Sequence, residues 1–148
     1  MTQTNPSQAR SLVNLAREAE QRGDTARALQ LYDDALSLLE DEADLPLLAD
    51  ALRWKGTLHR EQGETEVAYQ CYHQSLVHAE NCGSLSCRGH AYNCLAIVAQ
   101  RRGNLDESEQ LYAQASDLAT KAGDVRLLGM IEQNLGVLLN MRGNFVGA

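Results

Sequence analysis

Four glycines recur along the chain at a fixed interval of 40 residues: Gly23, Gly63, Gly103 and Gly143. Each is followed by a polar residue that suits a turn or a helix N-cap: Asp24, Glu64, Asn104 and Asn144. Glycine can end a helix in the left-handed conformation, and Asp or Asn can cap the helix that follows. This punctuation predicts a repeated pair of helices joined by a tight turn.

The residues around each glycine repeat in the same register. A small residue lies seven positions before it: Ala16, Gly56, Ala96 and Gly136. Another lies five positions after it: Ala28, Ala68, Ser108 and Ala148. An aromatic residue follows at nine positions and a small one at twelve: Tyr32, Tyr72 and Tyr112, then Ala35, Ser75 and Ala115. Small side chains let two helices approach closely, and a tyrosine that faces them is a knob with a matching hole.

A second turn recurs with the same period, at Ala43, Gly83 and Gly123. The residues that follow it, Asp44, Ser84 and Asp124, are predicted N-caps of the next helix. Few prolines and abundant Ala, Leu, Gln, Glu and Arg favour helix throughout. The expected helices lie near residues 8–21, 25–40, 46–61, 65–81, 85–101, 105–122 and 126–141.

The chain resembles the tetratricopeptide repeat family. The family pattern of small residue, turn glycine, alanine, aromatic and alanine is matched by Ala16, Gly23, Ala28, Tyr32 and Ala35, and again one and two periods later. The usual repeat has 34 residues, so the 40-residue period is similar to the long-repeat subgroup that includes kinesin light chains and Leu-Gly-Asn polarity adaptors. HEAT and armadillo arrays also have periods near 40, but the turn glycine and the Ala-Tyr-Ala ladder favour the tetratricopeptide interpretation.

This resemblance implies an all-α, right-handed α-solenoid of stacked helix-turn-helix hairpins. The expected array spans residues 9–148, with repeats at 9–44, 45–84, 85–124 and an incomplete 125–148, after a flexible N-terminus at 1–8. Such arrays bind a partner protein or peptide in a concave groove lined by the first helix of each hairpin. The implied function is a protein–protein interaction scaffold or regulatory module. The alternative is a peptide- or ligand-sensing domain that controls an attached effector.

Projecting the family geometry onto the chain gives a candidate groove. From the first two hairpins it takes Arg10, Val13, Asn14, Arg17, Arg53, Trp54, Thr57 and Arg60. From the last two it takes His90, Asn93, Ile97, Arg101, Met130, Gln133, Asn134, Val137 and Asn140. Arginine can hold carboxylates in a bidentate manner and Asn can bond peptide backbone, so an acidic or mixed peptide is the expected ligand.

Two alternatives remain open for these residues. The arginines could instead be a solvated face that pairs with helix carboxylates such as Glu20 and Glu61. Trp54, the one tryptophan, could be a binding hot spot or a half-buried packing residue between neighbouring first helices.

Histidines and cysteines crowd residues 73–94: His73, His78, Cys82, Cys87, His90 and Cys94. The spacing between Cys82 and Cys87 is wider than in a zinc knuckle, and the sequence has no second pair of ligands at a suitable spacing. No bound metal is therefore expected. His78 stands where other repeats have Leu38 and Leu118, and we interpret it as a tolerated polar substitution. The sequence has no phosphate-binding loop and no nucleophile motif, so neither a cofactor nor enzymatic activity is expected.

The formal net charge of −7 argues against a nucleic-acid or anionic-membrane surface. The sequence starts without a basic and apolar leader and has no apolar run of membrane-spanning length, so a cytoplasmic protein is expected. Its last predicted helix is apolar on more than one face, with Met130, Ile131, Leu135, Val137, Leu138, Leu139 and Met141. We therefore expect either a fragment of a longer protein or self-association through residues 126–148.

Overall fold

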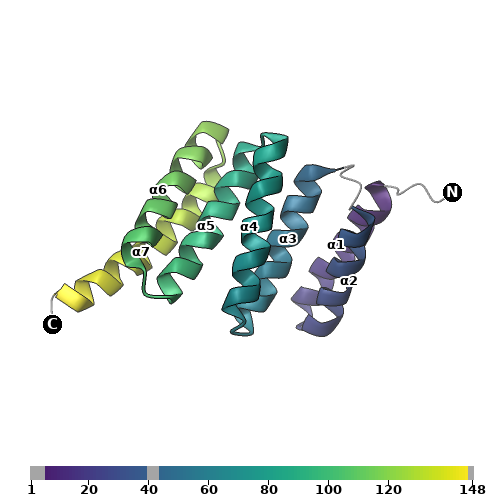
Figure 1. Ribbon diagram of the computed structural model, residues 1–148, viewed down its shortest axis with the longest axis horizontal. Helices are drawn as coiled ribbons and strands as arrows, with labels where there is room; N and C mark the ends of the chain where they lie inside the picture. The colour runs from purple at the N-terminus through teal and green to yellow at the C-terminus, as the bar shows by residue number, and fades with distance from the viewer. Residues whose placement is uncertain (1–5, 40–43, 147–148) are drawn as a thin grey trace. The chain divides into compact units, whose positions relative to one another are not determined.

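The computed structural model describes residues 6–39 and 44–146, which form seven α-helices and no strand (Figure 1). The helices are α1 (Pro6–Gln21), α2 (Thr25–Leu38), α3 (Leu45–Glu61), α4 (Thr65–Cys82), α5 (Leu85–Arg101), α6 (Leu105–Ala122) and α7 (Val125–Val146). The predicted all-α helical-repeat class is confirmed. Predicted and observed helix ends agree within two residues, except that α7 continues to Val146 instead of ending at 141.

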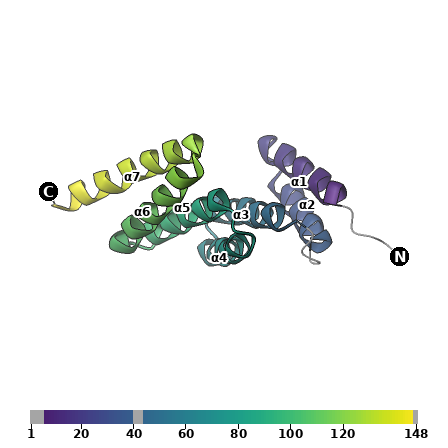
Figure 2. The same cartoon turned by 90° about the horizontal axis from the view of Figure 1, so that it is seen from above.

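The chain divides into two compact units, Met1–Cys82 and Gly83–Ala148. In the first unit α1 pairs with α2 and α3 pairs with α4, and α2 packs on α3 to join the two hairpins (Figures 1 and 2). In the second unit α5 pairs with α6, and α7 packs on α6 and also touches α5. The hairpin is therefore the building block of both units.

Glycines in the left-handed conformation end the helices where the sequence predicts turns. Gly23, Gly63, Gly83, Gly103 and Gly123 all have φ between 69° and 83°. At Gly23 the next amide, that of Asp24, donates to the carbonyl oxygen of Ala19 at 2.9 Å and closes the helix end. The turn expected at Gly143 and Asn144 is not formed, because α7 runs through both residues. Glycine permits the left-handed conformation but does not impose it.

Side-chain caps start the first helix of each later hairpin, as the sequence predicts. Asp44 accepts from the amide of Leu47 at 3.1 Å, Ser84 from that of Cys87 at 3.2 Å, and Asp124 from that of Leu127 at 3.0 Å. The hairpin turns differ from one another. Asp24 caps α2 through the amide of Arg27 at 3.2 Å, whereas Asn104 makes no side-chain cap bond.

The repeated tyrosines are the centres of the hairpin cores. Tyr32, Tyr72 and Tyr112 are each fully buried, as are the small residues predicted to receive them: Ala16, Ala28, Ala35, Gly56, Ala68, Ser75, Ala96, Ser108 and Ala115. Each phenol hydroxyl bonds a side chain of its hairpin's first helix: Glu20 for Tyr32, Thr57 for Tyr72 and Gln100 for Tyr112. Ser75 and Ser108 also bond carbonyl oxygens of the first helix, those of Ala49 and Ala96. The knob-and-hole prediction is confirmed in three hairpins.

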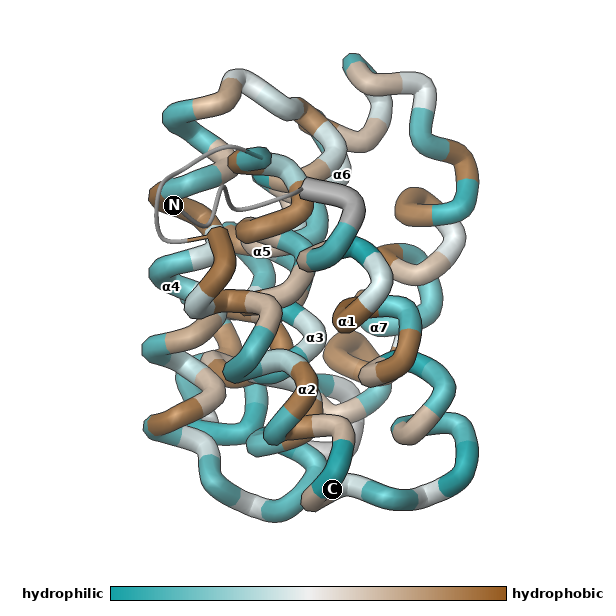
Figure 3. Tube along the Cα trace, turned by 90° about the vertical axis from the view of Figure 1, so that its right-hand side faces the viewer, coloured by the Kyte–Doolittle hydropathy of each residue, from teal (hydrophilic) through white to brown (hydrophobic). Residues whose placement is uncertain are grey.

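Apolar residues recur at intervals along the helices, with polar residues between them, as the hydropathy colouring shows (Figure 3). This spacing gives each helix an apolar face toward the core and a polar face on the other side. Within the described ranges, no helix combines the length and the apolar character needed to cross a membrane.

Candidate functional site

Trp54 is the centre of the candidate site in the first unit. Two guanidinium groups lie over its ring: the Cζ atom of Arg17 from α1 is 4.4 Å from the ring centroid, and that of Arg53 from α3 is 5.1 Å away. Both distances are within the range of a cation–π interaction. Trp54 is partly buried and packs against the hydrophobic core of this unit. Trp54 is therefore a half-buried packing residue, and its role as a binding hot spot stays a prediction.

The two arginines are held by neighbouring carboxylates. Arg17 pairs with Glu20 and Arg53 pairs with Asp50, each at 3.2 Å. The Arg17 side chain is 42% exposed, whereas that of Arg53 is only 12% exposed. Glu20 also accepts a hydrogen bond from the Tyr32 hydroxyl. Burial is the main cause that raises the pKa of Tyr32 well above its ordinary value, and Glu20 acts in the same direction. Arg17 is therefore the more accessible cation of the pair.

The remaining predicted residues of the first unit differ in accessibility. Arg10 pairs with Asp44 at 3.2 Å, and Asn14 is exposed. The Thr57 hydroxyl is bonded to the Tyr72 hydroxyl at 2.9 Å and to the carbonyl oxygen of Arg53, so it contributes to hairpin packing. The interpretation of Val13 as a groove residue is wrong, because Val13 is 2% exposed within the core.

Arg60 is a further predicted groove residue, at the end of α3. Its Nε atom is buried and has no hydrogen-bond partner among residues 6–39 and 44–146. The predicted pairing of an arginine with Glu20 is observed at Arg17.

Two asparagines meet in the second unit, one from α5 and one from α7. The Asn134 amide donates to the Asn93 Oδ1 atom at 3.1 Å. Asn93 is 1% exposed, so its side chain is part of the packing rather than an open surface. Asn134 is partly exposed, and Gln133 beside it is exposed. Of these three polar side chains, the two on α7 are the ones that a partner would reach.

The other predicted residues of the second unit form a mixed surface. Ile97 is partly buried against the core of this unit, whereas Arg101 is exposed. Met130 and Val137 are exposed to 41% and 52%. The His90 Nε2 atom lies 3.9 Å from an Asp124 carboxylate oxygen that also accepts from the Ser86 hydroxyl at 2.9 Å. Asn140 is exposed on α7.

The cysteines and histidines do not assemble into a ligand set. Among the described residues, no group of three His, Cys, Asp or Glu side chains is placed to hold a metal ion. All four cysteines are free thiols, and Cys71, Cys87 and Cys94 are buried. Burial raises the pKa of the Cys71 thiol, which keeps it protonated and unreactive. The absence of a bound metal stays a prediction.

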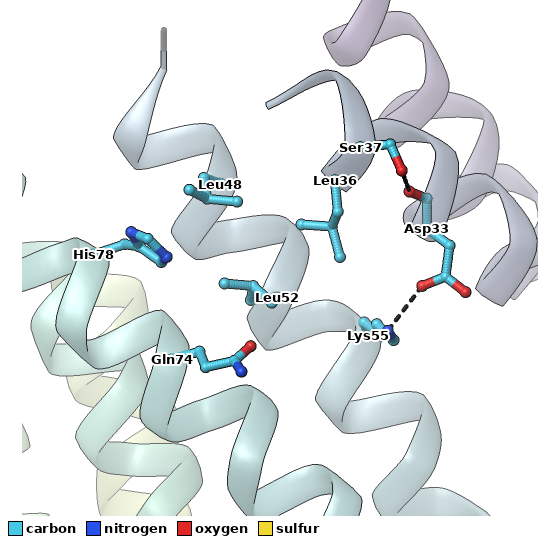
Figure 4. Close-up of a pocket in the computed structure, with 8 residues that line it drawn as sticks. All are labelled: Asp33, Leu36, Ser37, Leu48, Leu52, Lys55, Gln74 and His78. Atoms are coloured by element: carbon cyan, nitrogen blue, oxygen red, sulfur yellow. Dashed lines mark hydrogen bonds and ion pairs between the residues drawn. The ribbon is translucent and has the colours of Figure 1, made fainter. Parts of the chain in front are cut away.

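A cavity of about 490 Å³ lies between α2, α3 and α4, in the first unit (Figure 4). Its apolar lining consists of Leu36, Leu48 and Leu52. Its polar lining consists of Asp33, Ser37, Lys55, Gln74 and His78, and the sequence analysis did not connect these residues. The sequence did contain a signal for this cavity, because Lys55 and His78 stand at repeat positions that other copies fill with leucine. The equivalents of Lys55 are Leu15, Leu95 and Leu135, and those of His78 are Leu38 and Leu118.

Two protein-family models of the tetratricopeptide repeat match the sequence, one at residues 11–46 and the other at residues 87–148. Together these segments cover more than half of the chain. The chain belongs to the tetratricopeptide repeat family. No protein with a curated description matches it significantly. The repeat fold is typical of protein-interaction modules rather than enzymes, and this chain is such a module.

Solved structures with the same fold are distant in sequence. BtubC (BKLC) from P. vanneervenii is 20% identical with a TM-score of 0.77, over 93% of this chain and 56% of that one. Aspartyl phosphate phosphatase F from Bacillus subtilis is 20% identical with a TM-score of 0.80, over 89% of this chain and 34% of that one. The putative kinesin light chain TPR-like repeats of Podosopora anserina are 17% identical with a TM-score of 0.74, over 94% and 69%. The chain thus spans about half of BtubC and a third of the phosphatase.

Proposed function

We propose that the face formed by α1 and α3 binds an acidic segment of a partner polypeptide, with Arg17 and Trp54 at its centre. The observation that carries this proposal is the contact of the Trp54 ring with two guanidinium groups, whose Cζ atoms lie 4.4 and 5.1 Å from the ring centroid. A carboxylate that approaches Arg17 meets a cation already oriented by the ring and by Glu20, so little side-chain entropy is lost on binding. Tryptophan and arginine are also the residues most often found in binding hot spots.

The charge distribution supports an acidic ligand. The arginines of α1 and α3 are Arg10, Arg17, Arg53 and Arg60, in a chain whose formal net charge is −7. Arg60 adds a buried Nε donor for which residues 6–39 and 44–146 provide no acceptor. A ligand carboxylate would supply such an acceptor, since an unpaired buried donor costs free energy. For the second unit by itself, we propose that Asn134, Gln133 and Arg101 are the polar side chains that contact a partner.

Trp54 provides the test, because the sequence contains no other tryptophan and its fluorescence reports on this face directly. We expect acetylated hexaglutamate amide to change the Trp54 emission in a saturable manner, and more strongly at low than at high salt. The Arg17→Glu variant should weaken binding at least tenfold, equivalent to about 1.4 kcal/mol. Arg17 is preferred to Arg53 for this purpose because Arg53 is largely covered.

The matched control is Arg27→Glu, which makes the same charge change at an exposed position on α2. It should leave binding within about twofold if the site is local, since screening limits long-range effects at moderate salt. Equal loss in both variants would mean that the peptide responds only to net charge. An unchanged Trp54 emission, with binding detected by calorimetry, would place the ligand elsewhere.

We also propose that α7 mediates self-association. Four apolar side chains of this helix are well exposed: Val125 at 78%, Met130 at 41%, Val137 at 52% and Leu139 at 54%. Leu127, Ile131 and Leu138 of the same helix are buried in the core. A helix that is apolar on two sides normally packs against neighbours on both.

A further inference from the structure

The cavity between α2, α3 and α4 lies on the second-helix side of the first unit, and the proposed acidic-peptide site does not use it. Figure 4 shows an apolar floor with a polar group at each end. The Lys55 ammonium and the Asp33 carboxylate form an ion pair of 2.7 Å at one end. His78 and Gln74 of α4 lie at the other end. The volume of about 490 Å³ is enough for a large side chain together with adjoining backbone.

Two departures from the repeat pattern line this one cavity. At the position of Lys55 the other copies have Leu15, Leu95 and Leu135, and at the position of His78 they have Leu38 and Leu118. Leu95 and Leu118 are buried in their own unit. In this repeat the two leucines are replaced by groups that form hydrogen bonds, and both border the same space. Two departures from the repeat pattern thus lie at the two ends of one cavity.

His78 in addition has an unmet bonding capacity. Its Nδ1 atom is buried and finds no hydrogen-bond partner in the described part of the chain. A buried polar atom without a partner costs free energy, which a ligand group can recover on binding. The Asp33 side chain is 53% exposed, so beside its bond to Lys55 it can still receive a second cation.

The charge around the cavity indicates the sign of the ligand. The three helices that line the cavity carry six carboxylates and four Lys or Arg side chains, and within the lining Asp33 and Lys55 are the carboxylate and the cation. The net charge of these helices is therefore −2, and the half-exposed Asp33 carboxylate beside an apolar floor is complementary to a ligand that is both basic and apolar.

We propose that this cavity is a second docking site, which takes a partner segment with one large apolar side chain next to a lysine or arginine. The apolar side chain lies on Leu36 and Leu52, and the adjoining backbone bonds His78 and Gln74. The basic side chain pairs with Asp33. This site is independent of the Trp54 face, and either can exist without the other.

The test is a titration of the full chain, labelled at leucine methyl groups, with the acetylated and amidated tripeptide Lys-Leu-Lys, followed by NMR. We expect saturable shifts of the Leu36, Leu48 and Leu52 methyl groups. The matched peptides Lys-Ala-Lys and Glu-Leu-Glu should bind at least fivefold more weakly. Equal binding of either peptide would overturn the proposal. Free leucine that binds as tightly as the tripeptide would also overturn it, and would indicate a small-metabolite site.

Variants of the chain separate the cavity from the rest of the surface. Gln74→Trp fills the cavity from an exposed position and should weaken tripeptide binding at least tenfold. Gln114→Trp makes the same change one repeat later, also at an exposed position, and should leave binding within twofold. Equal effects of the two variants would contradict the assignment.

His78→Leu restores the residue of the other repeats. It should keep or raise the melting temperature, because the unpartnered Nδ1 atom is removed, and should weaken tripeptide binding at least threefold. Unchanged binding in a folded His78→Leu protein would show that His78 is only a packing substitution and would refute its role in the site.

Discussion

At the scale of single residues, equivalent repeat positions have unequal surroundings. The position seven residues before each turn glycine is alanine in two copies, Ala16 and Ala96, both fully buried. At Gly56, however, a Cβ atom would lie 2.9 Å from the Cys71 Cβ atom and 2.9 Å from the Tyr72 Cε1 atom. These atoms are fixed by the helix backbone and by a buried ring, so they cannot move aside cheaply.

We therefore predict that Gly56→Ala destabilises the protein although alanine is the better helix former. Overpacking of a tight core costs about 1–3 kcal/mol, which exceeds the gain of about 1 kcal/mol expected from helix propensity. Chemical denaturation followed by circular dichroism measures the net loss.

Gly136→Ala is the matched control, because a Cβ atom at Gly136 would meet nothing within 4 Å among the described residues. The same substitution there should stabilise α7 by about 0.5–1 kcal/mol. A stabilising Gly56→Ala would show that α3 and α4 can separate enough to admit the methyl group.

At the scale of elements, the start of α7 depends on Asp124. Its carboxylate caps the helix through the Leu127 amide at 3.0 Å and accepts from the Ser86 hydroxyl of α5 at 2.9 Å. The bond from the Leu127 amide is the main cause that lowers the pKa of Asp124, and Ser86, His90 and Arg126 act in the same direction against burial. One side chain thus both begins α7 and ties it to α5.

We predict that Asp124→Ala costs about 0.5–2 kcal/mol at neutral pH, as for other lost N-caps. Because the folded-state pKa is depressed, the charge-dependent part of this stabilisation is fully present above the unfolded pKa of about 3.9. It is lost as the pH falls through the lower folded-state pKa. The difference between the wild type and the variant, measured by denaturation, should therefore narrow in strong acid.

Asp117→Ala provides the comparison for this experiment. Asp117 pairs with Lys121 on the surface, and both side chains are 63% exposed. Such pairs contribute about 0–1 kcal/mol. A loss at Asp117 as large as that at Asp124 would mean that general surface charge, and not the cap, stabilises this unit.

At the scale of the whole molecule, the charge is divided unevenly. The segment Met1–Cys82 carries seven of the 13 Lys and Arg residues but 14 of the 20 Asp and Glu residues, so it accounts for the entire net charge of −7. The segment Gly83–Ala148 is formally neutral and contains the exposed apolar side chains of α7. Charge repulsion that opposes association is therefore weakest in the unit that contains α7.

We predict that the chain sediments as a concentration-dependent oligomer in analytical ultracentrifugation. The Val137→Glu variant should shift the distribution toward monomer, because it places a charge on an exposed apolar face. Val67→Glu makes the same change at a valine of α4 that is 39% exposed, and should have little effect. A wild-type protein that stays monomeric at high concentration would contradict the proposal.

The chain should also fold without metal. We expect a chelator to leave the melting temperature unchanged and elemental analysis to find no stoichiometric zinc, since a structural zinc would contribute folding free energy directly. One metal ion per chain would show that the cysteines and histidines act in a way that neither their spacing nor their placement indicates.

The sequence by itself determined the helices, their ends and the hairpin cores. Turn glycines, N-caps such as Asp44 and Asp124, and knobs such as Tyr32 act within one hairpin or one turn. Their physical requirements are therefore the same wherever they recur, and a repeated pattern reveals them. The one misplaced end, at Gly143, is a position where the local signal permits a turn without requiring it.

Only the tertiary structure decided which repeated positions differ in environment. It showed that Gly56 is crowded while Ala16 and Ala96 fit, that Val13 is buried, and that Lys55 and His78 border one cavity. It also placed Arg17 over Trp54, 37 residues further along the chain. These properties depend on the distance between helices that are far apart in sequence, and a difference of less than an ångström in helix approach decides them.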